Sequence, residues 1–209
     1  MYLADNGLSP YFAYAESFEV LPGIDPNTKN SHKPLEGKLY ETGIKYAPSF
    51  LDGYINLALF DLEQTNSLVS TGSGQQTQAG EVTSQGIELE GSVQATEALR
   101  LTAAYTYTDA KTNDTGNGDR QASLIPRHQA SFWGNYKVQQ GPVSGLEVGT
   151  GVRYIGSSVG IGAVNADYTP IYGSAQVPAQ TVWDAMIGYD FAKNWRAQVN
   201  VNNLLNDTY

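Results

Sequence analysis

Apolar and polar residues alternate along most of this chain, and this period of two constrains the fold more than any other feature. In residues 99–110, LRLTAAYTYTDA, one row holds Leu99, Leu101, Ala103, Tyr105 and Tyr107. The row between them holds Arg100, Thr102, Ala104, Thr106 and Thr108. Successive side chains of a β-strand point to opposite faces, so this segment is a strand with one apolar and one polar face. The question is whether the apolar face meets a protein core or lipid.

The same pattern, combined with turn residues, predicts nine strands and no helix. The expected strands are residues 10–18, 38–48, 54–65, 81–95, 99–110, 128–139, 145–156, 181–191 and 195–204. They contain 9 to 15 residues each. Strands of soluble sheets usually have about five or six residues, whereas a tilted strand needs roughly 9–11 to cross a membrane. The lengths therefore favour membrane-crossing strands.

Aromatic residues of the apolar rows gather at strand ends, among them Tyr107, Tyr154, Trp183, Phe191 and Trp195. A transmembrane barrel places such rings in girdles at the two lipid boundaries, whereas a soluble sandwich buries its rings centrally. Their positions indicate that the apolar face meets lipid.

The connections between the expected strands alternate strictly between long and short. In chain order they hold 19, 5, 15, 3, 17, 5, 24 and 3 residues. An up-and-down barrel with tight periplasmic turns at one rim and extended loops at the other gives this pattern, and a Greek-key sandwich rarely does. The sequence thus predicts an all-β fold, an antiparallel up-and-down transmembrane β-barrel.

Composition narrows the classes of function and the extent of the barrel. No run of 18 or more apolar residues could form a spanning helix. The net charge of −9 and the scattered 12 basic residues exclude nucleic acid as an expected partner, because phosphate binding needs clustered Lys and Arg. The first residues contain no export signal, and an odd number of strands cannot close antiparallel. We therefore expect a partial barrel, an internal piece of a larger one.

Seven phrases of the sequence resemble, in order, the C-terminal part of the barrel of TonB-dependent siderophore receptors, most of all the ferrichrome and other hydroxamate-type receptors. They are SPYFAYAESFEVLPG, KPLEGKLYETGIKY, GEVTSQGIELEG, LTAAYTYTDA, IPRHQASFWGNY, GPVSGLEVGTGVRYIGSS and VNVNNLLNDTY. Each falls on an expected strand or beside one, and together they cover nearly the entire chain, so that residues 1–209 are interpreted as one partial barrel domain.

The resemblance implies a barrel of about 22 strands in the bacterial outer membrane, closed by an N-terminal plug. It implies uptake of ferric siderophores with energy relayed by TonB, which contacts a region N-terminal to this chain. The plug, the upstream strands and the final strand are absent here. Ferric siderophore is then a transported ligand, outer-membrane lipid a partner, and no resident cofactor is expected. Alternatives are a passive porin, a TonB-dependent receptor for haem or cobalamin, and a soluble β adhesin.

The candidate ligand contacts are three aromatic residues, Trp133, Tyr168 and Tyr172. Trp133 lies on the polar row of its strand and should point inward near the loop end, and the two tyrosines belong to the connection of 24 residues. A siderophore presents a partly apolar shell that suits such rings.

No catalytic or metal site is expected. Glu88 with Glu90, and Asp184 with Asp190, share the inward row, where we expect them to meet basic residues of neighbouring strands rather than to act as an acid/base pair. Those basic residues are Arg100, Lys137, Arg153 and Arg196. His32 and His128 lack further ligands at suitable spacing. Residues 112–120, TNDTGNGDR, lack the Glu of an EF-hand and are expected to form a surface loop. The sequence does not match barrel phospholipases or proteases.

Overall fold

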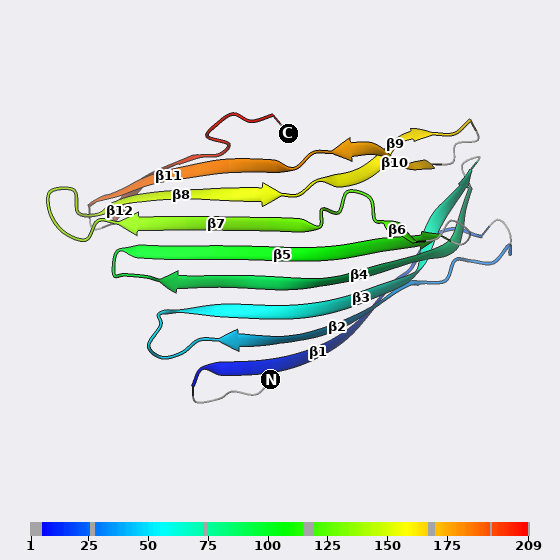
Figure 1. Cartoon of the computed structure of the whole chain (residues 1–209), viewed down its shortest axis with the longest axis horizontal. Helices are drawn as coiled ribbons and strands as arrows, with labels where there is room; N and C mark the ends of the chain where they lie inside the picture. The colour runs from blue at the N-terminus through cyan, green and yellow to red at the C-terminus, as the bar shows by residue number, and fades with distance from the viewer. Residues whose placement is uncertain are drawn as a thin grey trace.

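Figure 1 shows the computed structural model of the chain, which describes residues 6–25, 28–72, 75–114, 119–166, 170–192 and 194–208. Nine strands follow one another in a single antiparallel sheet. They are β1 (Leu8–Glu19), β2 (Leu35–Tyr46), β3 (Gly53–Gly72), β4 (Gln75–Gln94), β5 (Leu99–Asp114), β7 (His128–Lys137), β8 (Leu146–Ile155), β11 (Gln180–Ala192) and β12 (Trp195–Val201). The nine predicted strands are confirmed, and so is their up-and-down order.

Three short strands were not predicted. β6 (Asp119–Gln121) pairs with the end of β5, and β9 (Ser158–Val164) pairs with β10 (Pro170–Val177) in a separate two-stranded sheet. No helix in the described part of the chain is long and apolar enough to span a membrane.

The apolar rows of neighbouring strands fall into register, which makes one whole face of the sheet apolar. One row runs from β3 to β11 through Ile55, Gly91, Ala103, Phe132, Val152 and Trp183. The next row along the strands belongs to the opposite face and runs through Asn56, Glu90, Ala104, Ser131, Arg153 and Val182. The two-faced character predicted for single strands thus extends across the sheet.

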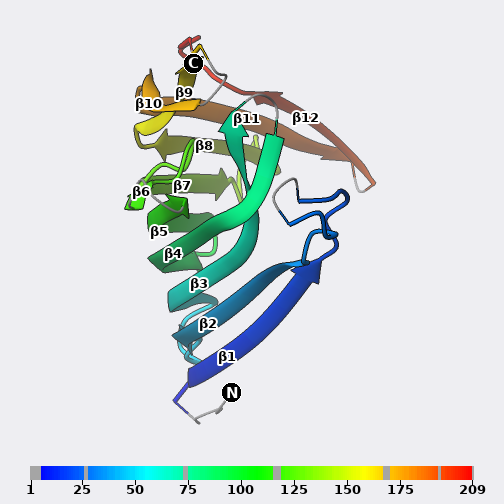
Figure 2. The same ribbon diagram turned by 90° about the vertical axis from the view of Figure 1, so that its right-hand side faces the viewer.

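The sheet bends into an open trough (Figure 2). Contacts between side chains place the polar row on its concave side. Two polar contacts on this face reach over an intervening strand: Lys137 of β7 to Asp190 of β11, and Arg196 of β12 to Glu147 of β8. Side chains on the concave side of a curved sheet converge, whereas those on the convex side diverge. Contacts that span an intervening strand therefore identify the concave face. We call the polar face the inner face and the apolar face the outer face.

The outer face is open to the surroundings. The exposed fractions of three of its central side chains are 45% for Leu89, 47% for Phe132 and 52% for Ile187. Apart from glycine and proline, only four apolar residues in the described ranges are buried, and all are small: Ala58, Ala110, Ala122 and Val182. A single layer of strands has no core of its own, so an apolar solvent must cover this face.

Aromatic girdles appear on the outer face, as the sequence predicts. Toward the short turns lie Tyr46, Tyr136, Tyr189, Phe191 and Trp195, and toward the long connections lie Tyr14, Tyr40, Tyr105, Tyr154 and Trp183. Ring contacts tie neighbours within each girdle, because Tyr14 lies 4.9 Å from Tyr40 and Phe191 lies 6.5 Å from Trp195 between ring centroids. This is the arrangement of a membrane barrel wall.

The strands extend further than predicted at the long-connection end. Residues 66–80 were expected to form a loop, but most of them continue β3 and β4 as a hairpin whose pairing shifts register near Asn66. Asn66 has a φ of 63°, a left-handed conformation that Asn tolerates. Because the main-chain ladder needs no apolar pattern, this polar, Gly-rich segment pairs without the signal that marks a membrane strand.

The last predicted strand, in contrast, ends earlier than residue 204. β12 stops at Val201, and the chain then turns at Asn203, which has a φ of 54°. The Asn203 side chain accepts a hydrogen bond from Asp207 N at 2.9 Å and donates one to Asp207 O at 2.8 Å. These bonds replace the strand ladder with a local turn.

Candidate functional site

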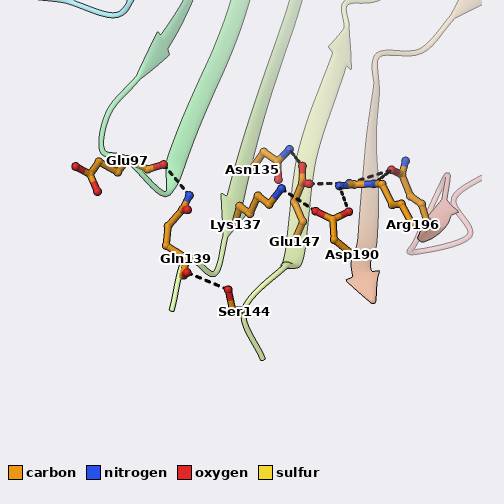
Figure 3. Close-up of polar contacts among 9 residues, drawn as sticks. Glu97, Asn135, Lys137, Gln139, Ser144, Glu147, Asp190 and Arg196 are labelled. Carbon is orange, nitrogen blue, oxygen red and sulfur yellow. Dashed lines mark hydrogen bonds and ion pairs between the residues drawn. The ribbon is translucent and has the colours of Figure 1, made fainter. Parts of the chain in front are cut away.

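The inner face carries a network of charged side chains near the short turns (Figure 3). Arg196 places one guanidinium nitrogen 2.6 Å from Glu147 Oε2 and another 3.2 Å from Asp190 Oδ1. Lys137 Nζ lies 2.8 Å from the other oxygen of Asp190. Asn135 Nδ2 donates to Glu147 Oε1 at 2.5 Å. The network joins β7, β8, β11 and β12 and leaves each of its carboxylates with at least two donors.

Gly188 makes room for this network. It is the cross-strand partner of Glu147 on β8 and of Gln198 on β12. A Cβ at position 188 would lie 2.8 Å from Arg196 Nη2. The guanidinium therefore lies flat over the backbone of β11 and reaches the next strand only because position 188 has no side chain.

Asp184 forms a second polar centre nearer the long connections. Arg153 Nε lies 2.8 Å from Asp184 Oδ2, and Asn203 N donates to Asp184 Oδ1 at 3.0 Å. The carboxylate thus joins β8, β11 and the turn that follows β12. The prediction that Asp184 and Asp190 meet basic residues of neighbouring strands is confirmed by these contacts.

The same prediction is wrong for the other carboxylate pair. Within the described ranges neither Glu88 nor Glu90 forms an ion pair, and neither does Arg100. The cross-strand partners of Glu88 and Glu90 are uncharged: Ala58, Thr106, Asn56 and Ala104. Two side chains that point to the same face of a sheet can still lie far apart along the strands. The register of β3, β4 and β5 places no basic residue opposite either glutamate.

Aromatic rings on the inner face lie over glycines of the next strand. A Cβ at position 149 would be 2.7 Å from Trp133 Cζ2, and one at position 43 would be 2.7 Å from Tyr11 Cε1. A Cβ at position 86 would be 2.5 Å from Phe60 Cζ. The rings lie along the wall and cover backbone that the glycines leave bare. Sequence reasoning missed this pairing, although glycines at positions 149 and 151 of one inward row were its signal.

Of the three candidate ligand contacts, Trp133 lies on the inner face as expected. It is half-buried and lies near the middle of β7, paired with Thr102 and Gly151, rather than near the loop end. The position along the strand was therefore wrong, because His128, five residues earlier, is where β7 begins.

The two tyrosines belong to the long connection between β8 and β11. Tyr168 lies outside the described residues. Tyr172 lies on β10, where the guanidinium carbon of Arg120 is 3.4 Å from its ring centroid. This stacking joins two connections on the long-connection side. Contact of the three residues with a ligand stays a prediction.

The two histidines lie in different parts of the described chain, His128 on β7 and His32 between two strands. His128 Nδ1 is 2.9 Å from Tyr105 Oη, which places it in the girdle of the outer face. His32 lies in the connection between β1 and β2. Among the described residues there is no group of three or more His, Cys, Asp and Glu side chains that could hold a metal ion. The surface loop expected at 112–120 is shorter than predicted, because residues 112–114 belong to β5 and residues 119–120 to β6. Asn113 donates to Asp119 at 2.9 Å between these strands, and residues 115–118 lie outside the described ranges.

Comparison with known proteins agrees with this geometry. Residues 1–204 match the family model described as "TonB dependent receptor-like, beta-barrel". The chain belongs to the TonB-dependent receptor β-barrel family. The family predicted from the seven phrases is confirmed, and with it the outer membrane as the location of this barrel.

Relatives of this TonB-dependent receptor barrel match it from end to end. It is 37% identical to the ferrichrome outer membrane transporter/phage receptor of Escherichia coli, over 100% of this chain and 27% of that protein. It is 34% identical to the ferrioxamine B receptor of Salmonella typhimurium, over 100% of this chain and 29% of that protein. The chain thus spans less than a third of the length of these relatives.

Solved structures show the same fold. The ferripyoverdine receptor of Pseudomonas aeruginosa superposes with a TM-score of 0.80 at 23% identity, over 97% of this chain and 28% of that one. The siderophore receptor PiuA of Acinetobacter baumannii gives a TM-score of 0.72 at 25% identity, over 96% of this chain and 30% of that one.

Proposed function

We propose that this chain forms part of the wall of an outer-membrane receptor that imports ferric siderophores with energy relayed by TonB. The observation that carries the proposal is the match over the whole chain to a ferrichrome transporter and a ferrioxamine B receptor. In this proposal the ferric siderophore is cargo, outer-membrane lipid covers the outer face, and TonB acts through a region outside this chain.

The two faces suit this role physically. An unsatisfied backbone group costs several kcal/mol in hydrocarbon, and the antiparallel ladder satisfies these groups from β1 to β12. The inner face is polar, and its charge networks are held against the wall rather than projecting into the bore. Such a wall leaves space for hydrated or protein contents while the outer face contacts acyl chains.

We further infer a role in transport without catalysis, since the family is one of receptors. Trp133, Tyr168 and Tyr172 remain proposed contacts for the ligand. Tyr172 is the better placed of the two described residues, because it lies on the side of the long connections, where a ligand from the medium arrives.

A second candidate is import of a different metal chelate. The metal-pseudopaline receptor CntO of Pseudomonas aeruginosa is 34% identical to this chain, over 100% of this chain and 29% of that protein, and the ferrioxamine B receptor has the same identity. Because receptors of different metal chelates are equally similar to this chain, its sequence supports import of a metal chelate in general more strongly than import of any particular chelate.

The test is uptake by the full-length receptor that contains this chain, expressed in an outer membrane without other siderophore receptors. Radiolabelled ferric ferrichrome, ferric ferrioxamine B and a metal-pseudopaline complex are supplied with and without TonB. The proposal predicts saturable uptake of a ferric siderophore that requires TonB. Uptake of the pseudopaline complex alone favours the second candidate, and TonB-independent uptake that rises linearly with concentration contradicts both and indicates a passive pore.

A further inference from the structure

The hairpin formed by β9 and β10 stands apart from the rest of the wall. The two strands pair with each other and with no other described strand. They continue the connection between β8 and β11 beyond the long-connection end of the large sheet (Figure 1). A hairpin of two strands is marginally stable by itself in water, so contacts with another segment must hold it in place.

The segment that contacts the hairpin is the connection between β5 and β7, of which we call residues 119–127 the strap. Leu124 N donates to Val159 O of β9 at 2.7 Å. The guanidinium carbon of Arg120 lies 3.4 Å from the ring centroid of Tyr172 on β10, which is a cation–π contact. The strap therefore contacts both strands of the hairpin.

The strap is fixed to the large sheet at both of its ends. At one end β6 pairs with β5, and Ala122, which is buried, donates its N–H to Ala110 O at 2.9 Å. At the other end Arg127 O accepts a hydrogen bond from Thr108 N, also at 2.9 Å. The contacts with the hairpin can therefore break while the strap stays on β5.

Leu124 holds the strap in a strained backbone conformation. Its φ is 62°, a left-handed value that a bulky residue rarely adopts. The residue is 66% exposed, so burial of the side chain does not explain this φ. The hydrogen bond to Val159 is a contact that the strained main chain makes in return. Backbone strain persists where the surrounding structure imposes it, and it is common in segments that switch between two states.

From these observations we propose that the strap and the β9–β10 hairpin form a latch that opens and closes as one unit. When the contacts with Val159 and Tyr172 break, Leu124 relaxes and the hairpin swings away from the strap. The pivot lies next to Gly156, whose N–H donates to His128 O at 2.7 Å and so stays on the wall. The proposal rests on the proposed function in one respect, that cargo arrives on the side of the long connections, where opening of the latch is a step of its uptake.

Hydrogen exchange of the full-length receptor in lipid nanodiscs tests the latch without cargo. Arg120→Gln removes the cation–π contact, so the amides around Leu124 and those of the hairpin should both exchange about fivefold faster. Leu124→Asn should slow both sets, because Asn tolerates this φ and relieves the strain. Arg127→Gln is the matched control, since it removes a cation of the same connection that pairs with Asp109 of β5 at 3.3 Å.

Two results of the exchange measurement would overturn the proposal. One is a change that is confined to the strap or to the hairpin, because the two would then open separately. The other is a shift in the same direction for Arg120→Gln and Leu124→Asn, because the backbone of Leu124 would then not be the strained element.

A disulfide across the latch tests its role in uptake. Leu124 Cγ marks the approximate place of the sulfur in Leu124→Cys, and it lies 3.9 Å from where a Cβ at position 160 would be. Leu124→Cys with Gly160→Cys therefore brings two sulfurs within bonding reach. After oxidation with copper–phenanthroline, we expect this receptor to import at least tenfold more slowly at a saturating concentration of chelate. Dithiothreitol should restore the rate.

The two single-cysteine variants, oxidised in the same way, are the controls for the disulfide. The probe is whichever of the three radiolabelled chelates named above the parent receptor imports. Equal uptake by the oxidised and reduced forms overturns the proposal, and so does failure of the two cysteines to join in the heat-modifiable receptor. If the parent imports none of the chelates, the proposed function fails, and hydrogen exchange still decides whether strap and hairpin open together.

Discussion

At the scale of single residues, the glycines of the inner face decide where large side chains lie. Gly149 and Gly188 have cross-strand neighbours that lie in the space a Cβ would occupy, Trp133 in one case and Arg196 in the other. Period-two patterning identified Trp133 as inward-facing but said nothing of the ring's orientation. The ring covers its own wall because the next strand carries no side chains at positions 149 and 151.

Substitution at Gly149 tests this packing. Gly149→Ala should destabilise the full-length receptor by about 1–3 kcal/mol, because the new methyl overlaps the indole of Trp133. Gly134→Ala is the matched control, since a Cβ there would be 3.6 Å from Leu101 Cδ2, an ordinary contact. Urea unfolding in detergent micelles gives both values. If Trp133→Ala does not reduce the effect of Gly149→Ala in the double variant, the ring is not the cause.

Facing can also be tested at two successive residues. Ala103 lies on the outer row of β5 between the two aromatic girdles, and Thr102 lies on the inner face, 3.1 Å from Ser92 between hydroxyl oxygens. Ala103→Arg should cost about 2–4 kcal/mol of assembly free energy, because it places a charge near the bilayer midplane. Thr102→Arg should be mild. The abundance of heat-modifiable receptor in the outer membrane measures both, and equal losses would show that the assigned faces are wrong.

At the scale of elements, the membrane-crossing strands could be predicted from the sequence and the other elements could not. A strand between lipid and a polar interior must alternate, so the pattern revealed β5, β8 and β11 directly. The β9–β10 hairpin and the ends of β3 and β4 nearest the long connections lie beyond the part of the sheet that is apolar on its outer face. Strand pairing there needs only backbone hydrogen-bonding groups. Contacts across strands, such as Arg196 over Gly188, depend on register, which the alternation of one strand does not specify.

The inner charge network should contribute to how β7, β8, β11 and β12 hold together. Arg196→Gln leaves the half-buried carboxylate of Glu147 with Asn135 alone as its described partner. Since the Arg196 side chain is 35% exposed, solvent screening makes the expected loss of unfolding free energy small. Arg196→Lys keeps the charge and should lose less. Urea unfolding at low and high salt measures the effect, and an Arg196→Gln variant as stable as the parent at low salt would contradict the role.

At the scale of the whole molecule, the sheet is a single layer of strands with an apolar outer face and a polar inner face. Its described residues form no core of large side chains, and its apolar side chains lie on the convex outside. A soluble protein would bury these residues between layers. Membership of the TonB-dependent receptor β-barrel family agrees with the lipid contact proposed for the outer face.

Spin labels along β5 provide the most direct test, because the chain itself contains no cysteine. Single cysteines are introduced at positions 100 to 105 of the full-length receptor, labelled, and placed in lipid bilayers. Oxygen, which partitions into the membrane, should broaden the labels at 101, 103 and 105, and a water-soluble nickel chelate should broaden those at 100, 102 and 104. Accessibility without this alternation, or with the two sets exchanged, would contradict the account.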